Sequence, residues 1–336
     1  MSLAPTARGQ LRRRLIPLLV VPVLAAIAVS AFTWASASPE PHDVPIGVVG
    51  PPAAIQSTED RPAEHDGAYD LHSYDSAGEA RDAIEDREVY GALVQTSSGT
   101  QLLTASAASP AVAQILTSTF ASPDAGGSAP TVVDVVPADT DDPRGTAFGS
   151  MVLPLVLVSV VTAVIVLMIA RSGWQKLAMI VVAAILGSLT AIAIAQGGFG
   201  IVQGNWALNL IAPALTVAAL ASAIVGAVSA FGKVGFVAVA PIMLFLGNPW
   251  AGATSSPYLL PEPAGLIGQL LPPGAGASAL RSIAFFDGAG AGTPLVVLCV
   301  WVALGLAGIC VGAVRHRDTA GELMETARPV MAAMDR

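Results

Sequence analysis

The chain has 336 residues, of which 54% are hydrophobic and only 12% are charged, and its mean hydropathy is +0.67. Soluble domains carry roughly 25% charged residues, so this composition excludes an ordinary soluble protein and indicates a membrane protein. The formal net charge is −8, but the acidic residues gather in one insert and the basic residues at the ends of apolar runs. This distribution argues against nucleic acid as a partner.

The chain begins with a basic stretch, residues 1–14, which contains four arginines. Residues 15–37 follow as an apolar run of about the 20 residues that a helix needs to cross a bilayer, and they predict the first transmembrane helix. The basic start, the apolar middle and the ending Ala35-Ser36-Ala37 also fit a cleaved signal peptide. The length favours a retained anchor, because the apolar core of a signal peptide has about 7 to 15 residues.

Residues 38–145 form an insert in which strand and helix patterns alternate. Apolar runs predict strands at 44–50, 69–74, 91–95, 101–105 and 131–136, the third and fourth forming a hairpin. The capping box from Ser76 to Glu79 predicts a helix with Ala80, Ala83 and Ile84 on its buried face. Ser109-Pro110 predicts a second helix that runs to Phe120. The alternation predicts a small α/β domain built on one sheet.

Acidic residues and histidines in this insert raise the question of a metal site. The first predicted helix carries Glu79, Asp82, Glu85, Asp86 and Glu88, interleaved with Arg81 and Arg87. We interpret these residues as a solvated helix face. A zinc site at His42, His65 and His72 is conceivable, but the sequence lacks the spacings of zinc motifs, so we predict neither a metal nor a cofactor.

Residues 146–314 hold the remaining apolar runs and predict a five-helix bundle. The runs are 146–170, the two halves of 177–232, a shorter run from 234 to 245 or 250, and 293–314. The polar, Gly-rich stretch 196–206 divides the longest run into two helices. The fold class predicted is therefore a membrane all-α bundle of six transmembrane helices with an inserted extracellular α/β domain. None of the predicted spans contains an ionisable residue, which argues against a proton-coupled carrier.

Basic residues set the predicted orientation. With residues 1–14 in the cytoplasm, the later basic positions Arg171, Lys176, Lys233 and Arg315 also fall inside. We therefore predict a multi-pass protein of the cell membrane with both termini cytoplasmic and residues 38–145 extracellular.

The outer segment 250–292 is too apolar for a solvated loop and too rich in proline to span the membrane. We predict short helices at 262–271 and 276–286 that lie in the outer interface or re-enter the bundle. Glu262, Arg281 and Asp287 are the only charges in this segment and form a candidate outer gate if they pair, although isolated snorkelling is an alternative. The cytoplasmic tail, residues 315–336, has apolar residues at helical spacing and either contacts the inner surface or a subunit, or frays.

The sequence offers no catalytic residues, and we predict that the chain is not an enzyme. The stretch 226–233 resembles a phosphate-binding loop, but its glycine spacing is one residue too long and Val234 replaces the required Ser or Thr. Cys299 and Cys310 lie in one apolar run about 16 Å apart along a helix, too far to form a disulfide.

Four stretches carry a resemblance to a known family. They are the strand Val44–Gly50, the run Ser76–Ile84 with the following Tyr90–Val94, the lead Asp142–Gly145, and Leu271–Arg281 before the last span. In this order the stretches resemble the membrane subunits of type-2 ATP-binding-cassette (ABC) exporters, in the branch with an extracellular domain between the first two spans. That branch includes phage infection protein-like and actinobacterial permeases.

This resemblance implies an ABC transporter permease that forms a homodimer, or a heterodimer with a second permease, in the lipid bilayer. Such a subunit moves a hydrophobic or amphipathic substrate outward, powered by a separate cytoplasmic ATP-binding subunit. The candidate ATPase-contact loop is Arg171, Ser172, Gly173, Trp174, Gln175 and Lys176. This loop is short, and the alternative is a non-transporting cell-envelope scaffold or receptor whose extracellular domain binds a secretion or phage partner.

Overall fold

The computed structural model describes residues 7–37, 40–50, 67–96, 99–120 and 129–334. Side chains before Val21 and after Arg315 are not described. Of the sequence predictions, His65 and the outermost residues of both terminal stretches lie outside the described residues.

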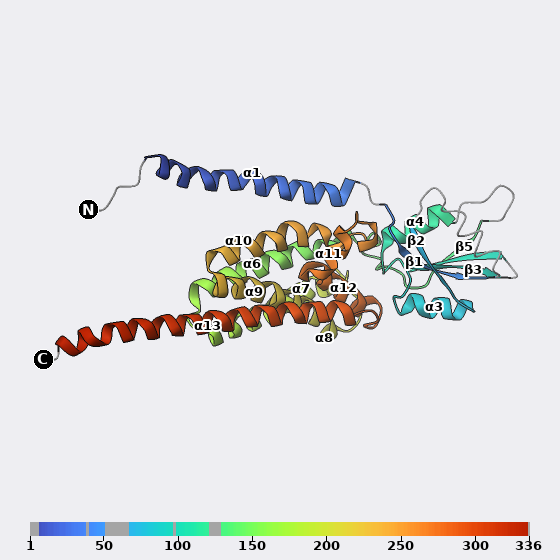
Figure 1. Cartoon of the computed structure of the whole chain (residues 1–336). Coiled ribbons are helices and arrows are strands. Elements are labelled where there is room, and N and C mark those ends of the chain that lie inside the picture. The colour runs from blue at the N-terminus through green and yellow to red at the C-terminus, as the bar shows by residue number, and fades with distance from the viewer. Residues whose placement is uncertain (1–6, 38–39, 51–66, 97–98, 121–128, 335–336) are drawn as a thin grey trace.

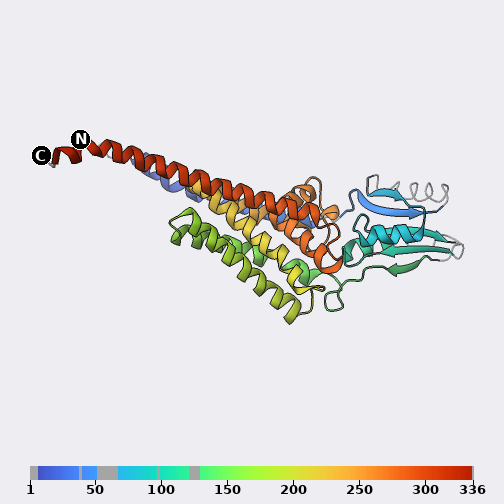
Figure 2. The same ribbon diagram turned by 90° about the horizontal axis from the view of Figure 1, so that it is seen from below.

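The molecule is elongated, with a sheet domain at one end and long helices running away from it (Figure 1). The start of α1 (Ala7–Ala37) and the end of α13 (Gly292–Met334) lie at the end of the molecule opposite the sheet domain, and the view from below agrees (Figure 2). The sequence predicted both termini on one side and the insert on the other, and this arrangement is compatible with that prediction.

The sheet domain contains one mixed sheet of five strands in the order β2-β1-β3-β4-β5. The strands are β1 (Val44–Val49), β2 (Tyr69–Ser73), β3 (Gly91–Thr96), β4 (Gly99–Thr104) and β5 (Thr131–Asp134). β1 runs parallel to β2 and β3, β3 and β4 form an antiparallel hairpin, and β4 runs parallel to β5. The predicted strands and their hairpin are confirmed.

Two helices cover opposite faces of this sheet because successive strand residues point to opposite sides. Leu93 and Leu102, which face each other across the hairpin, pack with the apolar face of α4 (Pro110–Phe120). The next pair along, Ala92 and Leu103, packs with Ala80, Ala83 and Ile84 of α3 (Ala77–Glu85). The predicted buried face of the first helix is therefore confirmed.

The predicted helix starts are also present. The Ser76 hydroxyl accepts a hydrogen bond from the Glu79 amide at 3.2 Å, and the Ser109 hydroxyl accepts from the Val112 amide at 3.2 Å. The Glu79 carboxylate accepts from the amide of Asp75 at 3.1 Å, one residue before the position that a capping box uses. Each cap satisfies amide groups that a helix leaves unpaired at its start.

Within the residues that the structure describes, four helices are long and apolar enough to cross a membrane: Thr146–Ile169, Gly173–Gly198, Trp206–Phe231 and Gly292–Arg315. They comprise α5 (Thr146–Ser150) with α6 (Val152–Ile169), α7 (Gly173–Ile192) with η2 (Ala193–Gly198), α8 (Trp206–Asn209) with α9 (Ile211–Phe231), and the first part of α13 (Gly292–Met334). These helices support four of the six predicted spans. Because α13 extends to Met334, the described part of the predicted cytoplasmic tail, residues 315–334, continues the last helix.

The other two predicted spans correspond to shorter apolar helices. Within α1 (Ala7–Ala37), the part with described side chains covers Val21–Ser36. The other, Lys233–Gly247, is α10 (Lys233–Pro241) continued by the π-helix η3 (Ile242–Gly247). Among the described parts of the chain, α1 contacts the helix bundle at the end next to the sheet domain. There Trp34 and Trp250 form an edge-to-face pair with ring centroids 6.0 Å apart.

Helix α9 is the centre of the bundle. In the apolar part of Trp206–Phe231, 67% of the residues are buried, against 22% to 33% for the other long helices. It crosses α13 along a seam of small residues. A methyl group added to Gly226 would lie 2.2 Å from the Gly305 carbonyl oxygen, and one added to Gly312 would lie 2.4 Å from the Ser229 carbonyl oxygen. Small residues allow two backbones to approach this closely, which is a common way of packing helices in lipid.

The outer segment comprises η4 (Pro249–Ala251), η5 (Pro257–Leu259), α11 (Ala264–Leu270) and α12 (Pro272–Phe285). α12 is largely buried and packs against α9 and α13. Its backbone comes so close to α9 that a methyl group on Gly276 would lie 2.1 Å from the Thr216 hydroxyl oxygen. α12 therefore packs into the bundle, whereas α11 covers its outer end.

This segment also contacts the sheet domain, a contact that the sequence did not predict. Leu259 of η5 is 1% exposed and belongs to the core between the sheet and α4. Phe286, directly after α12, is 6% exposed and belongs to the core between the sheet and α3. Burying one such side chain contributes about 1.5 to 3 kcal/mol, so both layers of the domain depend on the outer segment.

Candidate functional site

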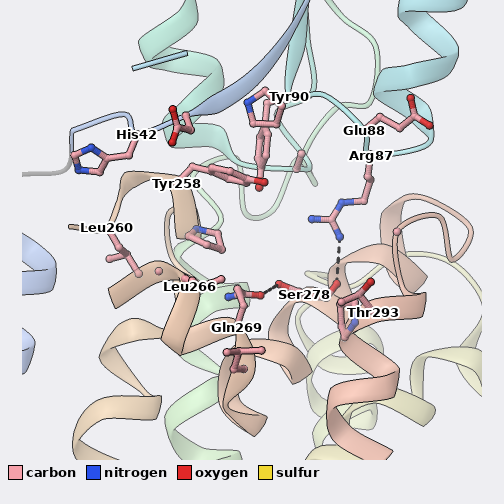
Figure 3. A pocket seen from close by; sticks show the side chains of 18 of the residues that line it. His42, Arg87, Glu88, Tyr90, Tyr258, Leu260, Leu266, Gln269, Ser278 and Thr293 are labelled. Atoms are coloured by element: carbon pink, nitrogen blue, oxygen red, sulfur yellow. Dashed lines mark hydrogen bonds between the residues drawn. The ribbon is translucent and has the colours of Figure 1, made fainter. Parts of the chain in front are cut away.

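A cavity of about 590 Å³ lies between the sheet domain and the outer segment. Its lining comes from the start of β1, the turn between α3 and β3, η5, α11, α12 and the first turns of α13 (Figure 3). We call it the interdomain cavity. Its volume lies in the range of about 300 to 1,000 Å³ that small-molecule sites occupy.

Two tyrosines form the wall on the domain side. The rings of Tyr90 and Tyr258 meet edge to face with centroids 5.5 Å apart, and the Tyr90 hydroxyl lies 3.2 Å from the Ser256 hydroxyl. The His42 amide donates to the Tyr258 carbonyl at 2.9 Å and ties the start of β1 to η5. Burial raises the pKa of the Tyr258 phenol, so it is neutral and able to donate a hydrogen bond at physiological pH.

Arg87 places a positive charge inside the cavity. Its Nη1 donates to the Ser278 carbonyl at 3.2 Å and to the Ser282 hydroxyl at 2.5 Å, and its guanidinium lies 5.2 Å from the centroid of the Phe286 ring. Figure 3 shows the side chain reaching from the domain toward Ser278. Burial lowers the pKa of Arg87, yet an arginine remains charged at neutral pH.

The backbone of Arg87 explains how it is positioned. Arg87 follows α3 in the left-handed region, with φ of 61°, where glycine is the usual residue. Its amide donates to the Ile84 carbonyl at 3.1 Å, and the next amide, of Glu88, donates to the Ala83 carbonyl at 2.9 Å. A side chain in this conformation costs roughly 1 to 2 kcal/mol relative to the right-handed region.

The opposite wall changes from polar to apolar. The Ser278 hydroxyl donates to the Gln269 side-chain carbonyl at 2.6 Å, and Nε2 of Gln269 donates to the Ala251 carbonyl at 2.9 Å. Beyond Gln269 the lining consists of Leu266 and Leu270, which are 69% and 55% exposed, and the half-buried Val297. The cavity therefore has a polar inner end and an apolar mouth between α11 and α13, an arrangement suited to an amphipathic ligand.

A second hollow, of about 790 Å³, lies between α6 and α7. Apart from Asp141 at its outer end, its lining is uncharged, with Leu155, Val158 and Leu186 among its apolar residues. It differs from the interdomain cavity in lacking a basic residue, so it offers shape and apolar contact alone.

The residues of the candidate outer gate lie apart in their interactions. Arg281 is 5% exposed, donates to the Ala253 carbonyl at 2.7 Å and lies 4.8 Å from the centroid of the Phe148 ring. Glu262 is exposed at the rim of the interdomain cavity, and no ion pair joins these two described residues to each other or to Asp287. The three residues therefore do not form the ion-paired cluster that the sequence suggested, because the Arg281 side chain is satisfied by a carbonyl and a ring. A gating role for them stays a prediction.

Burial, with repulsion from Arg87 as the next cause, lowers the pKa of Arg281 to about 10. Asp142 offsets part of this effect, while its carboxylate accepts hydrogen bonds from the amides of Ala147 and Phe148 at 3.1 and 2.7 Å. Through its contact with the Phe148 ring, Arg281 joins the outer segment to α5, the start of the first long helix.

The candidate ATPase-contact loop starts helix α7 at the end of the bundle far from the sheet domain. Ser172 and Gln175 form a full capping box, and the Lys176 ammonium donates to the Ser229 hydroxyl at 2.8 Å. Trp174 is 75% exposed. Lys233 and Arg315 lie at the same end, and Arg315 donates to the Ala230 carbonyl at 2.6 Å.

The described histidines, His42 and His72, lie apart from each other in the structure. His72 lies on the exposed strand β2 with Nε2 3.1 Å from a carboxylate oxygen of Asp70, and His42 lines the interdomain cavity. Within the described residues no cluster of three or more His, Cys, Asp or Glu residues has the arrangement of a metal site. Cys299 and Cys310 are both free and exposed on α13.

The sequence prediction for Arg87 was wrong. We interpreted it as part of a solvated helix face, whereas it ends the helix and contacts α12 across the interdomain cavity. The available signal was its position just after the helix and before the buried Val89. Tyr258, Gln269 and Ser278 were also missed, because their roles depend on contacts between segments far apart in the sequence.

Comparison with protein-family models, with curated proteins and with solved structures found no match to this chain. The fold and the cavity therefore define the class of protein directly: a mainly helical, membrane-associated protein with a small mixed-sheet domain.

Proposed function

We propose that this chain is the membrane permease subunit of a type-2 ABC exporter, which moves a hydrophobic or amphipathic substrate outward with a separate ATPase subunit. The observation that carries the proposal is the interdomain cavity, whose inner end is polar and whose mouth opens on the exposed leucines of α11. An amphipathic molecule leaving a bilayer needs such a site, because its two ends require different surroundings.

Two further features support this function. The helices are apolar over lengths that match a bilayer, and the proposed plan has six spans, with α1 and α10 completing the four long ones. Arg171, Lys176, Lys233 and Arg315 share the end of the bundle away from the sheet domain. By the positive-inside rule that end is cytoplasmic and the sheet domain extracellular.

The end of the helix bundle away from the sheet domain also suggests how a partner would bind. Trp174 is 75% exposed in the first turn of α7. Tryptophan and arginine are enriched among the residues that dominate protein interfaces. We propose that Trp174 and its neighbour Arg171 contact the ATPase, and that two permease subunits form the complete transporter.

The test is co-purification of the full chain with a nucleotide-binding subunit from the same cells, followed by ATP hydrolysis by the pair in vesicles. We expect the pair to hydrolyse ATP faster than the ATPase alone, and Trp174→Ala to abolish co-purification. Trp206→Ala is the matched control, since Trp206 is 47% exposed at the outer end of the bundle. An intact chain that retains no ATPase, and whose deletion leaves export unchanged, would refute the proposal.

One observation favours a second function, that of a non-transporting envelope scaffold or receptor. The inner turns are very short: three residues, Ala170 to Ser172, join α6 to α7, and Gly232 alone joins α9 to α10. They offer little surface to an ATPase. In this case the extracellular sheet domain binds a partner, and the same purification recovers an envelope protein in place of an ATPase.

A further inference from the structure

We propose that the interdomain cavity binds a lipid-like amphiphile with an anionic head, the head at Arg87 and the chain leaving between α11 and α13. This inference deepens the proposed function and rests on its membrane orientation. It does not depend on the ATPase.

The first argument is the charge at the inner end. No described carboxylate forms an ion pair with Arg87, although the residue is half-buried. The nearby Arg281 is also buried without a described carboxylate in ion-pair contact, and the two arginines repel each other. The hydrogen-bonding partners of Arg87, the Ser278 carbonyl and the Ser282 hydroxyl, are neutral and leave its charge uncompensated. Buried charges are normally paired, and an anion in the cavity would neutralise the charge of Arg87.

Hydrogen-bond donors surround the same place. One guanidinium nitrogen of Arg87, Nη1, is used by Ser278 and Ser282, and a guanidinium carries five N–H donors in all. The hydroxyls of Tyr258 and Thr293 belong to the same cavity lining. Charge-assisted hydrogen bonds from such groups are the strong ones in anion recognition.

Three carboxylates also line the cavity, so the sign of the preferred charge has to be decided by position. Asp43, Glu88 and Glu262 are all exposed, and Figure 3 shows Glu88 directed away from Ser278. Solvent screens exposed charges much more than a half-buried one. The inner end is therefore positive and the rim negative, which selects a head with a single anionic group over a polyanion.

The apolar mouth decides between a free anion and an amphiphile. Leu266 and Leu270 are exposed in the outer segment, and the exposed Val296 and Val300 continue the apolar surface along α13. Trp301 holds the two elements together, since its Nε1 donates to the Leu270 carbonyl at 2.8 Å. A free phosphate or carboxylate would gain nothing from this surface, whereas an acyl chain would bury it at about 25 cal/mol per Å².

The test measures lipid retention by the full-length protein in detergent, with native mass spectrometry. The probes are phosphatidylglycerol, phosphatidylcholine with the same chains, a quaternary ammonium amphiphile, and glycerol phosphate without chains. We expect phosphatidylglycerol to bind at least tenfold more tightly than each of the others, which corresponds to about 1.4 kcal/mol. Equal binding of the two lipids, stronger binding of the cationic amphiphile, or equal binding of glycerol phosphate would overturn the proposal.

Variants assign the binding to this cavity. Arg87→Gln should remove the preference for phosphatidylglycerol, whereas Arg81→Gln, which removes an equal charge from the exposed face of α3, the helix that Arg87 follows, should keep it. Equal losses in the two variants would overturn the proposal. If Arg87→Gln fails to fold, Leu266→Ser decides: this exposed residue should weaken binding of the lipid without changing the weak binding of glycerol phosphate. Because no ATPase is present, loss of the exporter function leaves this result intact, and the reverse also holds.

Discussion

The close crossing of α9 and α13 leads to a quantitative prediction for Gly226→Ala. The added methyl carbon would lie 2.2 Å from the Gly305 carbonyl oxygen and 2.9 Å from its carbonyl carbon and Cα. These atoms are backbone and cannot rotate away, so the helices must separate by roughly 1 Å, which forfeits a quarter to a half of the dispersion energy of each contact. Such overpacking costs about 1 to 3 kcal/mol.

The matched control is Gly187→Ala, in the apolar helix α7. Its added methyl would lie 3.7 Å from a methyl of Val158 and 3.8 Å from one of Val217, which are ordinary contacts. Both substitutions gain about 1 kcal/mol of helix propensity, so the difference between them isolates the clash. Because the entropy of unfolding grows with chain length, we expect Gly226→Ala to unfold at a temperature about 1 to 4 °C below the control, measured on the full chain in detergent. Equal melting temperatures would refute the reasoning that this seam is packed backbone to backbone.

Three further predictions concern single side chains. Asp142→Asn should destabilise the protein by about 1 to 2 kcal/mol in a detergent unfolding assay, because its carboxylate accepts two amide hydrogen bonds, the shorter from Phe148 at 2.7 Å; an unchanged melting temperature would contradict this. Ser172→Ala should cost about 1 kcal/mol by removing the capping box of α7, and Ser118→Ala, in an exposed position on α4, should cost less. Burial raises the pKa of Tyr258 above 10.0, so the stability gained from its neutral form is present below pH 10 and lost as pH rises through the folded-state pKa. Tyr258→Phe should therefore reduce the loss of stability in alkaline solution, and an identical pH profile would show that this phenol does not matter.

Local sequence signals predicted the sheet domain well, because its elements depend on neighbours in the chain. Ser76 and Ser109 open their helices where the hydroxyls reach the third following amide, and this spacing is visible in the sequence. The order of the strands depends on pairings between distant segments, for which one sequence contains no comparable signal.

The candidate site was predicted poorly for a related reason. The hydrogen bond from Arg87 to Ser282 joins residues 195 positions apart, so no local pattern announces it. The apolar segment 250–292 was predicted to lie in the outer interface or to re-enter the bundle, whereas its residues Leu259 and Phe286 are buried in the core of the sheet domain. Hydropathy shows that a side chain avoids water, but it does not show which surface covers it.

Helix α13 runs without a break from the interdomain cavity to the end of the molecule opposite the sheet domain. It begins beside the interdomain cavity at Thr293 and continues as one helix to Met334, a length of about 65 Å. From Leu295 to Arg328 it contains no proline, the commonest cause of a sharp kink. In the proposed topology, a tilt imposed on its first turn by a molecule entering the cavity would be transmitted along the whole helix, so that one element would couple events on the two sides of the membrane.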